Sequence, residues 1–237
     1  MEYEDAISLL RDILRENIPG HGSLAFSGGL DSTLLMHLSG YNLNPYTVGF
    51  RDSHDIKRSE EVSNILGFRL HEIYLDDVKL EDHVEILKNI DGSITRSEIG
   101  YELVLSVVLS STDDDTIVTG QGADELFYGY RRTIESGSNE DQWRKLIDRT
   151  LPREKKIAEY YGKEVIAPYL NQSIVKIAMS FDSSYHIRDG QGKAMIRDAA
   201  RSSGLPEQIY GYKKKAAQYG SGIDRYLKMV NYFSKLI

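Results

Sequence analysis

Apolar residues recur along the chain with two different periods. Residues 3–16 place them three and four positions apart, which predicts an amphipathic helix. Short runs at 24–26, 45–50 and 69–75 are rich in apolar, β-branched and aromatic residues, which is typical of strands. Helical patterns separate these runs. The alternation of strand and helix predicts an α/β fold with a doubly wound parallel sheet, in which ligands bind beyond the carboxyl ends of the strands.

The rest of the chain adds one strand and then becomes helical. The apolar run at 116–119 is typical of a buried central strand. After about residue 139 we find no strand pattern. The expected helices after the first are the one that begins at 33–38, then 57–66, 79–89, 98–111, 140–149, 153–161, 171–180, 192–202 and 224–236. We therefore expect a single domain over 1–237, with an α/β core at about 20–135 and a helical region at about 136–237.

The turn after the first predicted strand has the composition of an anion-binding loop. Gly28 and Gly29 let backbone N–H groups approach an anion, and the helix that follows adds unpaired donors at its N-terminus. The hydroxyl groups of Ser27 and Ser32 can donate as well. Asp31 would repel a phosphate unless a cation lies between them, and Mg²⁺ is the simplest such cation. A plain Gly-Gly turn before a capped helix is the alternative, but Ser-Gly-Gly-x-Asp-Ser after a buried strand favours the nucleotide loop.

A second loop repeats this arrangement after the strand at 116–119. The sequence there is Gly120-Gln121-Gly122-Ala123-Asp124-Glu125. Acidic residues at a helix start can simply complement the helix dipole. However, two such loops on neighbouring parallel strands would bring Asp31 and Asp124 together above the strand ends. The pair then predicts one shared Mg²⁺ site.

Composition narrows the chemistry further. The sequence has no cysteine, which excludes disulfides, thiolate metal sites and a Cys nucleophile or persulfide. It has no apolar run of membrane-spanning length and no signal-peptide pattern, so we expect a cytoplasmic location and no membrane partner. The net charge is −7, yet residues 186–237 carry ten Lys and Arg against four Asp and Glu. This basic quarter would suit a nucleotide-facing lid or a nucleic-acid surface, and scattered surface lysines are the alternative.

These motifs resemble those of a known family. The first loop resembles the PP-loop of ATP pyrophosphatases, which holds the β,γ-pyrophosphate of ATP. The segment at 119–130 resembles the Ser-Gly-Glu-Gly-Ala-Asp-Glu-Leu-Phe-Gly-Gly-Tyr signature of asparagine synthetases. The Pro-Tyr-Leu-Asn segment at 168–171 and the stretch at 187–222, which carries a lysine-bearing helix, a Gly-Leu-Pro turn and a basic loop, resemble the same family. The likeness spans about 20–225, most of a synthetase domain, without the glutaminase domain that precedes it in many members.

The resemblance implies a role for each matching residue. It implies a pyrophosphate grip by Ser27, Gly28, Gly29, Asp31 and Ser32, an adenosine site on the backbone of Ala25, Val48, Thr119 and Gly120, Mg²⁺ ligands Asp31 and Asp124, and catalytic residues Lys214, Gln121 and Lys193. A cation such as Lys214 beside the α-phosphate would stabilise the charge that develops during adenylyl transfer. The Tyr-Gly-Ser-Gly that follows the lysine run favours a mobile loop over the substrate rather than a solvated basic loop.

The implied function is an ATP-dependent, AMP-forming amide ligase that uses ATP and Mg²⁺. Two departures concern the acceptor: Gln121 replaces a family Glu and cannot act as a base, and Ile166 replaces an anion-binding Arg. The expected partners are a small, aspartate-like carboxylic acid, ammonia or an amine, a separate glutaminase subunit as one nitrogen source, and a second copy of the chain. Two other functions stay open, namely a PP-loop enzyme of RNA modification, although the chain has no recognisable RNA-binding appendage, and a non-catalytic ATP-binding subunit.

Overall fold

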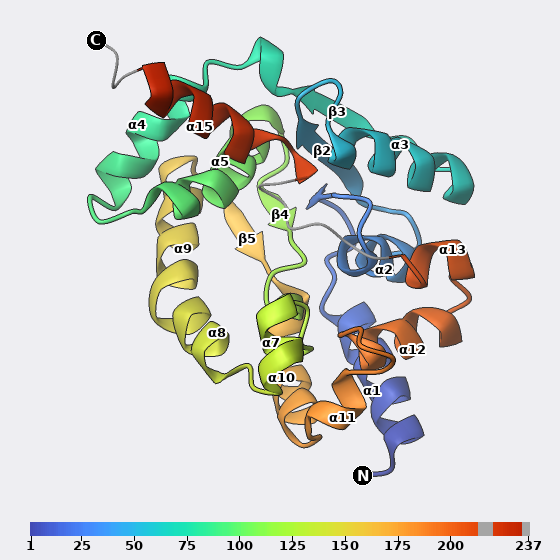
Figure 1. Ribbon diagram of the computed structural model, residues 1–237. Coiled ribbons are helices and arrows are strands. Elements are labelled where there is room, and N and C mark those ends of the chain that lie inside the picture. Colours follow the sequence, from blue (N-terminus) through green and yellow to red (C-terminus); the bar gives the residue numbers. More distant parts are fainter. Residues whose placement is uncertain (213–219, 234–237) are drawn as a thin grey trace.

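A single sheet lies at the centre of the protein (Figure 1). The computed structural model describes residues 1–212 and 220–233. Within them the sheet has five strands, β1 (Ser23–Ala25), β2 (Asn44–Gly49), β3 (His71–Tyr74), β4 (Thr116–Val118) and β5 (Glu164–Ile166). Their order is β3-β2-β1-β4-β5 and every pairing is parallel, which confirms the predicted fold class. The chain builds the sheet outward from β1 in one direction and then in the other, so the topological switch point lies between β1 and β4.

Helices cover both faces of the sheet. In the described residues they are α1 (Tyr3–Glu16), α2 (Leu30–Leu38), α3 (His54–Leu66), α4 (Leu80–Ile90), α5 (Arg96–Ser111), α6 (Ala123–Leu126), α7 (Arg131–Ser136), α8 (Glu140–Lys145), α9 (Leu151–Tyr160), α10 (Gln172–Met179), α11 (Ser183–His186), α12 (Ala194–Ser202), α13 (Glu207–Tyr210) and α15 (Ile223–Phe233). The helices at 3–16, 98–111 and 171–180 lie within two residues of where the apolar periodicity predicts them. None of the described helices is both long enough and apolar enough to cross a membrane.

Two apolar cores result, one on each side of the sheet. The first packs α1, α2, α10 and α12 against β1 and includes the fully buried Leu14, Leu34 and Met195. The second packs α4, α5, α9 and α15 against the other face and includes the fully buried Leu103 and Ile117. Because both faces are covered, the central strands are buried on both sides and carry apolar side chains, as parallel sheets require. The strands β1 and β4 are therefore packed between two apolar cores, which hold their carboxyl ends in place.

The strand β5 contradicts our expectation that the chain has no strand after residue 139. Val165 of β5 pairs with Ile117 of β4, and the Thr119 N–H donates to the Ile166 carbonyl at 2.9 Å. The strand is three residues long and lies at the sheet edge, with Glu164 exposed. A strand of this length has too few positions to display a period of two. The region expected to be helical thus contributes an edge to the sheet.

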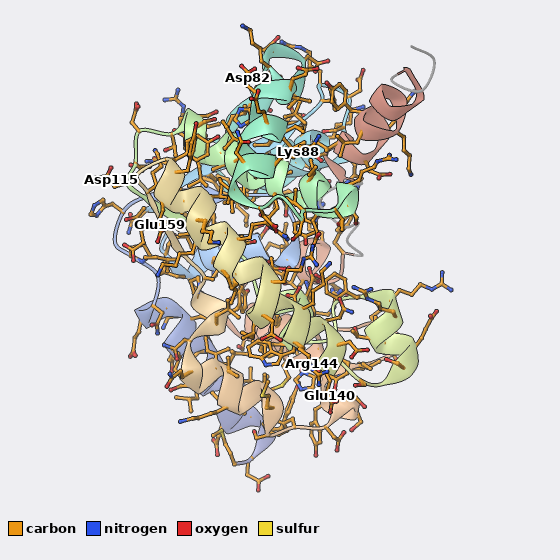
Figure 2. The ribbon with its side chains drawn as sticks, turned by 90° about the vertical axis from the view of Figure 1, so that its left-hand side faces the viewer. Asp82, Lys88, Asp115, Glu140, Arg144 and Glu159 are labelled. Atoms are coloured by element: carbon orange, nitrogen blue, oxygen red, sulfur yellow. The ribbon has the colours of Figure 1, made fainter. Side chains whose placement is uncertain are left out.

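The expected helices at 140–149 and 153–161 form one continuous helical run. Residues 146–150 make a wider π-type turn between α8 and α9. Pro152 has no N–H to donate to the preceding turn, and a wider turn accommodates that missing bond without ending the helix. Figure 2 shows this run along one side of the molecule, with Glu140 and Arg144 on α8 and Glu159 on α9. The run carries residues that reach the functional site.

Candidate active site

The first loop joins β1 to α2 through a tight turn. Gly28 has φ of +63°, and a Cβ at this position would lie 2.8 Å from the Arg58 carbonyl carbon on α3, so a side chain does not fit. The Ser32 hydroxyl accepts a hydrogen bond from the Ser27 N–H at 3.3 Å and donates to the Gly29 carbonyl at 3.4 Å. The loop is thus closed by its own serine, and α2 begins directly behind it with Asp31 in its first turn.

The second loop joins β4 to α6 and places Asp124 in the first turn of that helix. Gly129 shows how tightly the region around Asp124 is packed. A Cβ at Gly129 would overlap Asp124 Oδ1 and the Lys193 side chain. The absence of a side chain at residue 129 is therefore what lets the aspartate and the lysine approach each other.

Lys193 connects the two loops. Its Nζ lies 2.6 Å from Asp31 Oδ2 and 2.5 Å from Asp124 Oδ1, and the residue is only 5% exposed. The residue precedes α12 with φ of +64°, and its N–H donates to the Phe127 carbonyl at 2.7 Å. This left-handed conformation costs a non-glycine residue on the order of 1–3 kcal/mol and persists only where its surroundings hold it. Lys193 is thus a buried ion-pair partner of both aspartates.

The two carboxylates suit a Mg²⁺ ion as well as the lysine. An oxygen of each aspartate faces the same point, which is the position of the Lys193 Nζ. Mg²⁺ is commonly held by one or two carboxylates together with substrate phosphates and water. In the part of the chain that the structure describes, no group of three or more potential ligands could hold a metal by itself. The donor set therefore fits an ion that arrives with a phosphate ligand.

The two loops open onto a pocket of about 540 Å³. Nine of the residues assigned from the sequence line it, namely Ala25, Ser27, Asp31, Ser32, Val48, Thr119, Gly120, Gln121 and Asp124. Gly28, Gly29 and Lys193 do not line the pocket, although Lys193 reaches it through its two ion pairs. Lys214 lies outside the described residues.

Tyr169 stabilises the start of α2, directly after the first loop. Its fully buried hydroxyl donates to the Asp31 carbonyl at 3.1 Å. Burial raises the pKa of Tyr169 well above its ordinary value, and the neighbouring charges of Asp31 and Asp124 act in the same direction. The hydroxyl is therefore a permanent donor. The Pro-Tyr-Leu-Asn segment at 168–171 thus supports the start of α2 although it lies far away in the sequence.

Two buried acids, Glu125 and Glu154, also line the pocket. Glu125 accepts a hydrogen bond from the Tyr130 hydroxyl at 2.6 Å, and burial, together with the Asp124 charge, raises the pKa of Glu125. Glu154 of α9 accepts a hydrogen bond from the Gln121 side-chain amide at 2.8 Å. The pKa of Glu154 lies well above its usual range because of burial first and the charges of Glu102 and Glu125 next. Sequence reasoning did not select Glu154. The sequence does contain a signal for Glu154. Ile157 and Ala158 follow it by three and four positions, which places its carboxyl group on the apolar face of the helix.

An ionic cluster behind the pocket holds α5 and α9 together. Arg153 Nε donates to Glu102 Oε1 at 2.8 Å, and its other nitrogens reach Asp91 at 3.0 Å and Glu98 at 3.4 Å. Glu102 is completely buried, and that burial raises its pKa to about 7 against the opposing effect of Arg153. Because Arg153 precedes Glu154, this cluster also anchors the backbone of α9 next to Glu154.

A parallel sheet with two glycine-bearing acidic loops at its switch point defines a nucleotide-binding α/β protein. The family model described as asparagine synthase matches residues 22–157 and 142–235. The chain therefore belongs to the asparagine synthase family.

Individual relatives agree with this assignment. The glutamine-hydrolyzing asparagine synthetase of Rattus norvegicus is 26% identical over 82% of this chain and 38% of its own length. That of Gallus gallus is 24% identical over 90% of this chain and 42% of its own length. The chain thus spans less than half the length of these curated relatives. Among solved structures, the NH3-dependent NAD synthetase of Campylobacter jejuni aligns with 99% of this chain and 86% of its own, at 14% identity and a TM-score of 0.43.

Proposed function

We propose that the protein is an ATP-dependent, AMP-forming amide ligase of asparagine synthetase type. The observation that carries the proposal is the meeting of Asp31, Asp124 and Lys193 at the mouths of two loops that open onto one pocket. Opposite charges of this kind suit a pyrophosphate group and its counter-ion. Membership of the asparagine synthase family supports the reaction type.

The residues divide the work along the pocket. Ser27, Ser32 and the N–H groups of the first loop bind the β,γ-pyrophosphate, and the backbone of Val48 and Thr119 binds the adenosine. Asp31 and Asp124 would hold Mg²⁺, which would neutralise phosphate charge when bound. The acceptor carboxylate attacks the α-phosphorus, the bond to the bridging oxygen breaks, and pyrophosphate leaves. An amine then displaces AMP from the acyl-adenylate. We propose Lys214 as a further cation beside the α-phosphate.

The substrates follow from the family and the site together. We propose a small, aspartate-like acid as the acceptor. We propose ammonia, another amine or a separate glutaminase subunit as the nitrogen source. Gln121 and Ile166 are the two departures that concern the acceptor. The Gln121 side-chain amide donates to Glu154, and Ile166 is apolar where the family resemblance implies an anion-binding Arg.

Exchange of labelled pyrophosphate into ATP tests the first step. We expect exchange that depends on one member of a panel of carboxylic acids, with aspartate tested first. The variants D31N and D124N should lower exchange by about 100-fold, since each removes a charge that is needed in the transition state. The control E140Q changes an exposed carboxyl group on α8 and should exchange normally. Folded protein that binds ATP but exchanges with no acid would contradict the proposal and favour a nucleotide-binding subunit.

A further inference from the structure

Glu154 is a buried carboxyl group that the adenylylation step leaves without a role. It is 9% exposed and lines the nucleotide pocket from α9. Its Oε1 accepts a hydrogen bond from Gln121, which belongs to the same loop as Asp124. The loop that orients the proposed metal ligand therefore also orients this carboxyl group. A buried acid that is held at a pocket wall by a neutral donor can meet the bound substrate.

Glu154 also lines a second cavity, of about 520 Å³. Ile166, Asn17 and Leu170 line that cavity with it. Figure 2 shows α9 from outside and labels Glu159, five residues after Glu154, toward the end of the helix. A side chain that borders both cavities is accessible to a small molecule in either of them. Glu154 is thus placed where a small nucleophile could approach a substrate in the nucleotide pocket.

The surroundings of Glu154 favour proton transfer over ion pairing. Arg153, the neighbouring cation, donates its hydrogen bonds to Glu102 and Asp91 rather than to Glu154. Burial and the charges of Glu102 and Glu125 raise the pKa of Glu154. A carboxylate whose ionised form is disfavoured is a stronger proton acceptor than an exposed one, and it works best when its pKa approaches the ambient pH.

We propose that Glu154 is the proton acceptor for the amine that forms the amide, and that Gln121 is its positioning residue. This inference rests on the proposed function. The nitrogen forms a bond to the acyl carbon, the bond from that carbon to the phosphate oxygen breaks, and AMP leaves with the electron pair. The proton that the nitrogen loses passes to Glu154. Gln121 cannot take that proton, because an amide is not a base at neutral pH, but its N–H holds the carboxylate in place.

The test separates the two halves of the reaction in one preparation. Pyrophosphate exchange reports adenylylation, and the amide product reports attack by the amine. E154Q keeps the size of the side chain and removes the proton acceptor, whereas E154D keeps the carboxylate and shortens the side chain. E140Q makes the same Glu-to-Gln change at an exposed residue of α8 that lines neither cavity, and it serves as the matched control. Hydroxylamine, which is less basic than ammonia, serves as a second nucleophile.

We expect E154Q to lower kcat for amide formation by about 100-fold or more. The rate of pyrophosphate exchange should fall far less. E154D should recover part of the loss. The defect should shrink with hydroxylamine, whose nitrogen gives up its proton more readily, and a merely structural role would not produce that difference. Normal amide formation by E154Q, or a change in KM alone, would overturn the inference while wild-type exchange still supports the ligase. Absence of exchange in the wild type would instead remove the proposed function itself.

Discussion

Replacing Lys193 by methionine should expose how strongly the site depends on one buried cation. The substitution keeps most of the length of the side chain and removes the charge that lies within 2.6 Å of both Asp31 and Asp124. Removing one partner of a buried ion pair costs about 3–5 kcal/mol, because the remaining charge is left uncompensated. The Asp124 side chain is 24% exposed and the Asp31 side chain 5%, so water relieves part of that cost. We therefore expect a loss near the lower limit, about 3 kcal/mol.

Thermal unfolding in EDTA measures this loss. For a chain of this length, about 3 kcal/mol lowers Tm by about 6 °C, since the entropy of unfolding grows with residue number. Adding Mg²⁺ should then stabilise K193M more than the wild type, because the ion meets two carboxylates that no longer share a lysine. At ten times its Kd, Mg²⁺ would return about 1.4 kcal/mol. A K193M variant that is within about 1 kcal/mol of wild type in EDTA would refute the reasoning.

Two further variants separate the charge from other effects of the change. K155M makes the same substitution at an exposed lysine whose pairing with Glu159 spans 3.9 Å, so it should cost less than about 1 kcal/mol. K193G also removes the cation but relieves the backbone strain at φ of +64°. It should therefore unfold at a higher temperature than K193M. Equal stability of the two variants would show that the backbone conformation stores no strain.

Three other substitutions test the support of the site. G28A should lower the free energy of unfolding in urea by about 3 kcal/mol and abolish ATP binding in calorimetry, because its Cβ meets the α3 backbone. G67A is the control. Gly67 has φ of +74° but open space around it, so G67A should lower the free energy of unfolding by only about 1 kcal/mol. Y169F should cost about 1 kcal/mol in the same denaturation and lower pyrophosphate exchange, since it leaves the Asp31 carbonyl without this donor. The pKa of Glu102 is about 7 in the native protein against about 4.5 unfolded, so the native state binds more protons and the free energy of unfolding should fall as pH rises from about 4.5 to 7. E102Q should flatten that dependence in denaturation curves at several pH values, and an unchanged slope would assign it to other groups.

The sheet could be predicted from sequence where a strand carries several apolar residues and a glycine-rich turn follows it. The strands β1 and β4 and the loops after them are of this kind, and they supplied Asp31 and Asp124. The strand β5 could not be predicted, because three residues at an edge depend on their partner strand rather than on their own pattern. Its position is fixed by the pairing of Val165 with Ile117, a contact between distant parts of the chain.

Lys193 and Glu154 show why the charges of the site were harder to predict. A lysine at the start of a helix is usually a surface residue, and the partners that bury Lys193 lie 162 and 69 positions earlier in the chain. Glu154 follows an arginine on an amphipathic helix, where a charged pair is ordinarily solvated. Its burial arises from packing against Gln121 and from the ionic cluster around Arg153. Both residues gain their roles from tertiary contacts that local sequence patterns do not encode.

The loop after β4 joins two electrostatic environments in one pocket. At one end, Asp124 and Lys193 are held as a charged pair, which suits the binding of phosphate and a counter-ion. At the other end, Gln121 positions Glu154, whose burial raises its pKa and so makes its carboxylate a stronger proton acceptor. Because Gln121 and Asp124 are three residues apart on one short loop, a change in either should disturb both halves of the reaction. The spacing within this loop is therefore what couples adenylylation to amide formation in the mechanism that we propose.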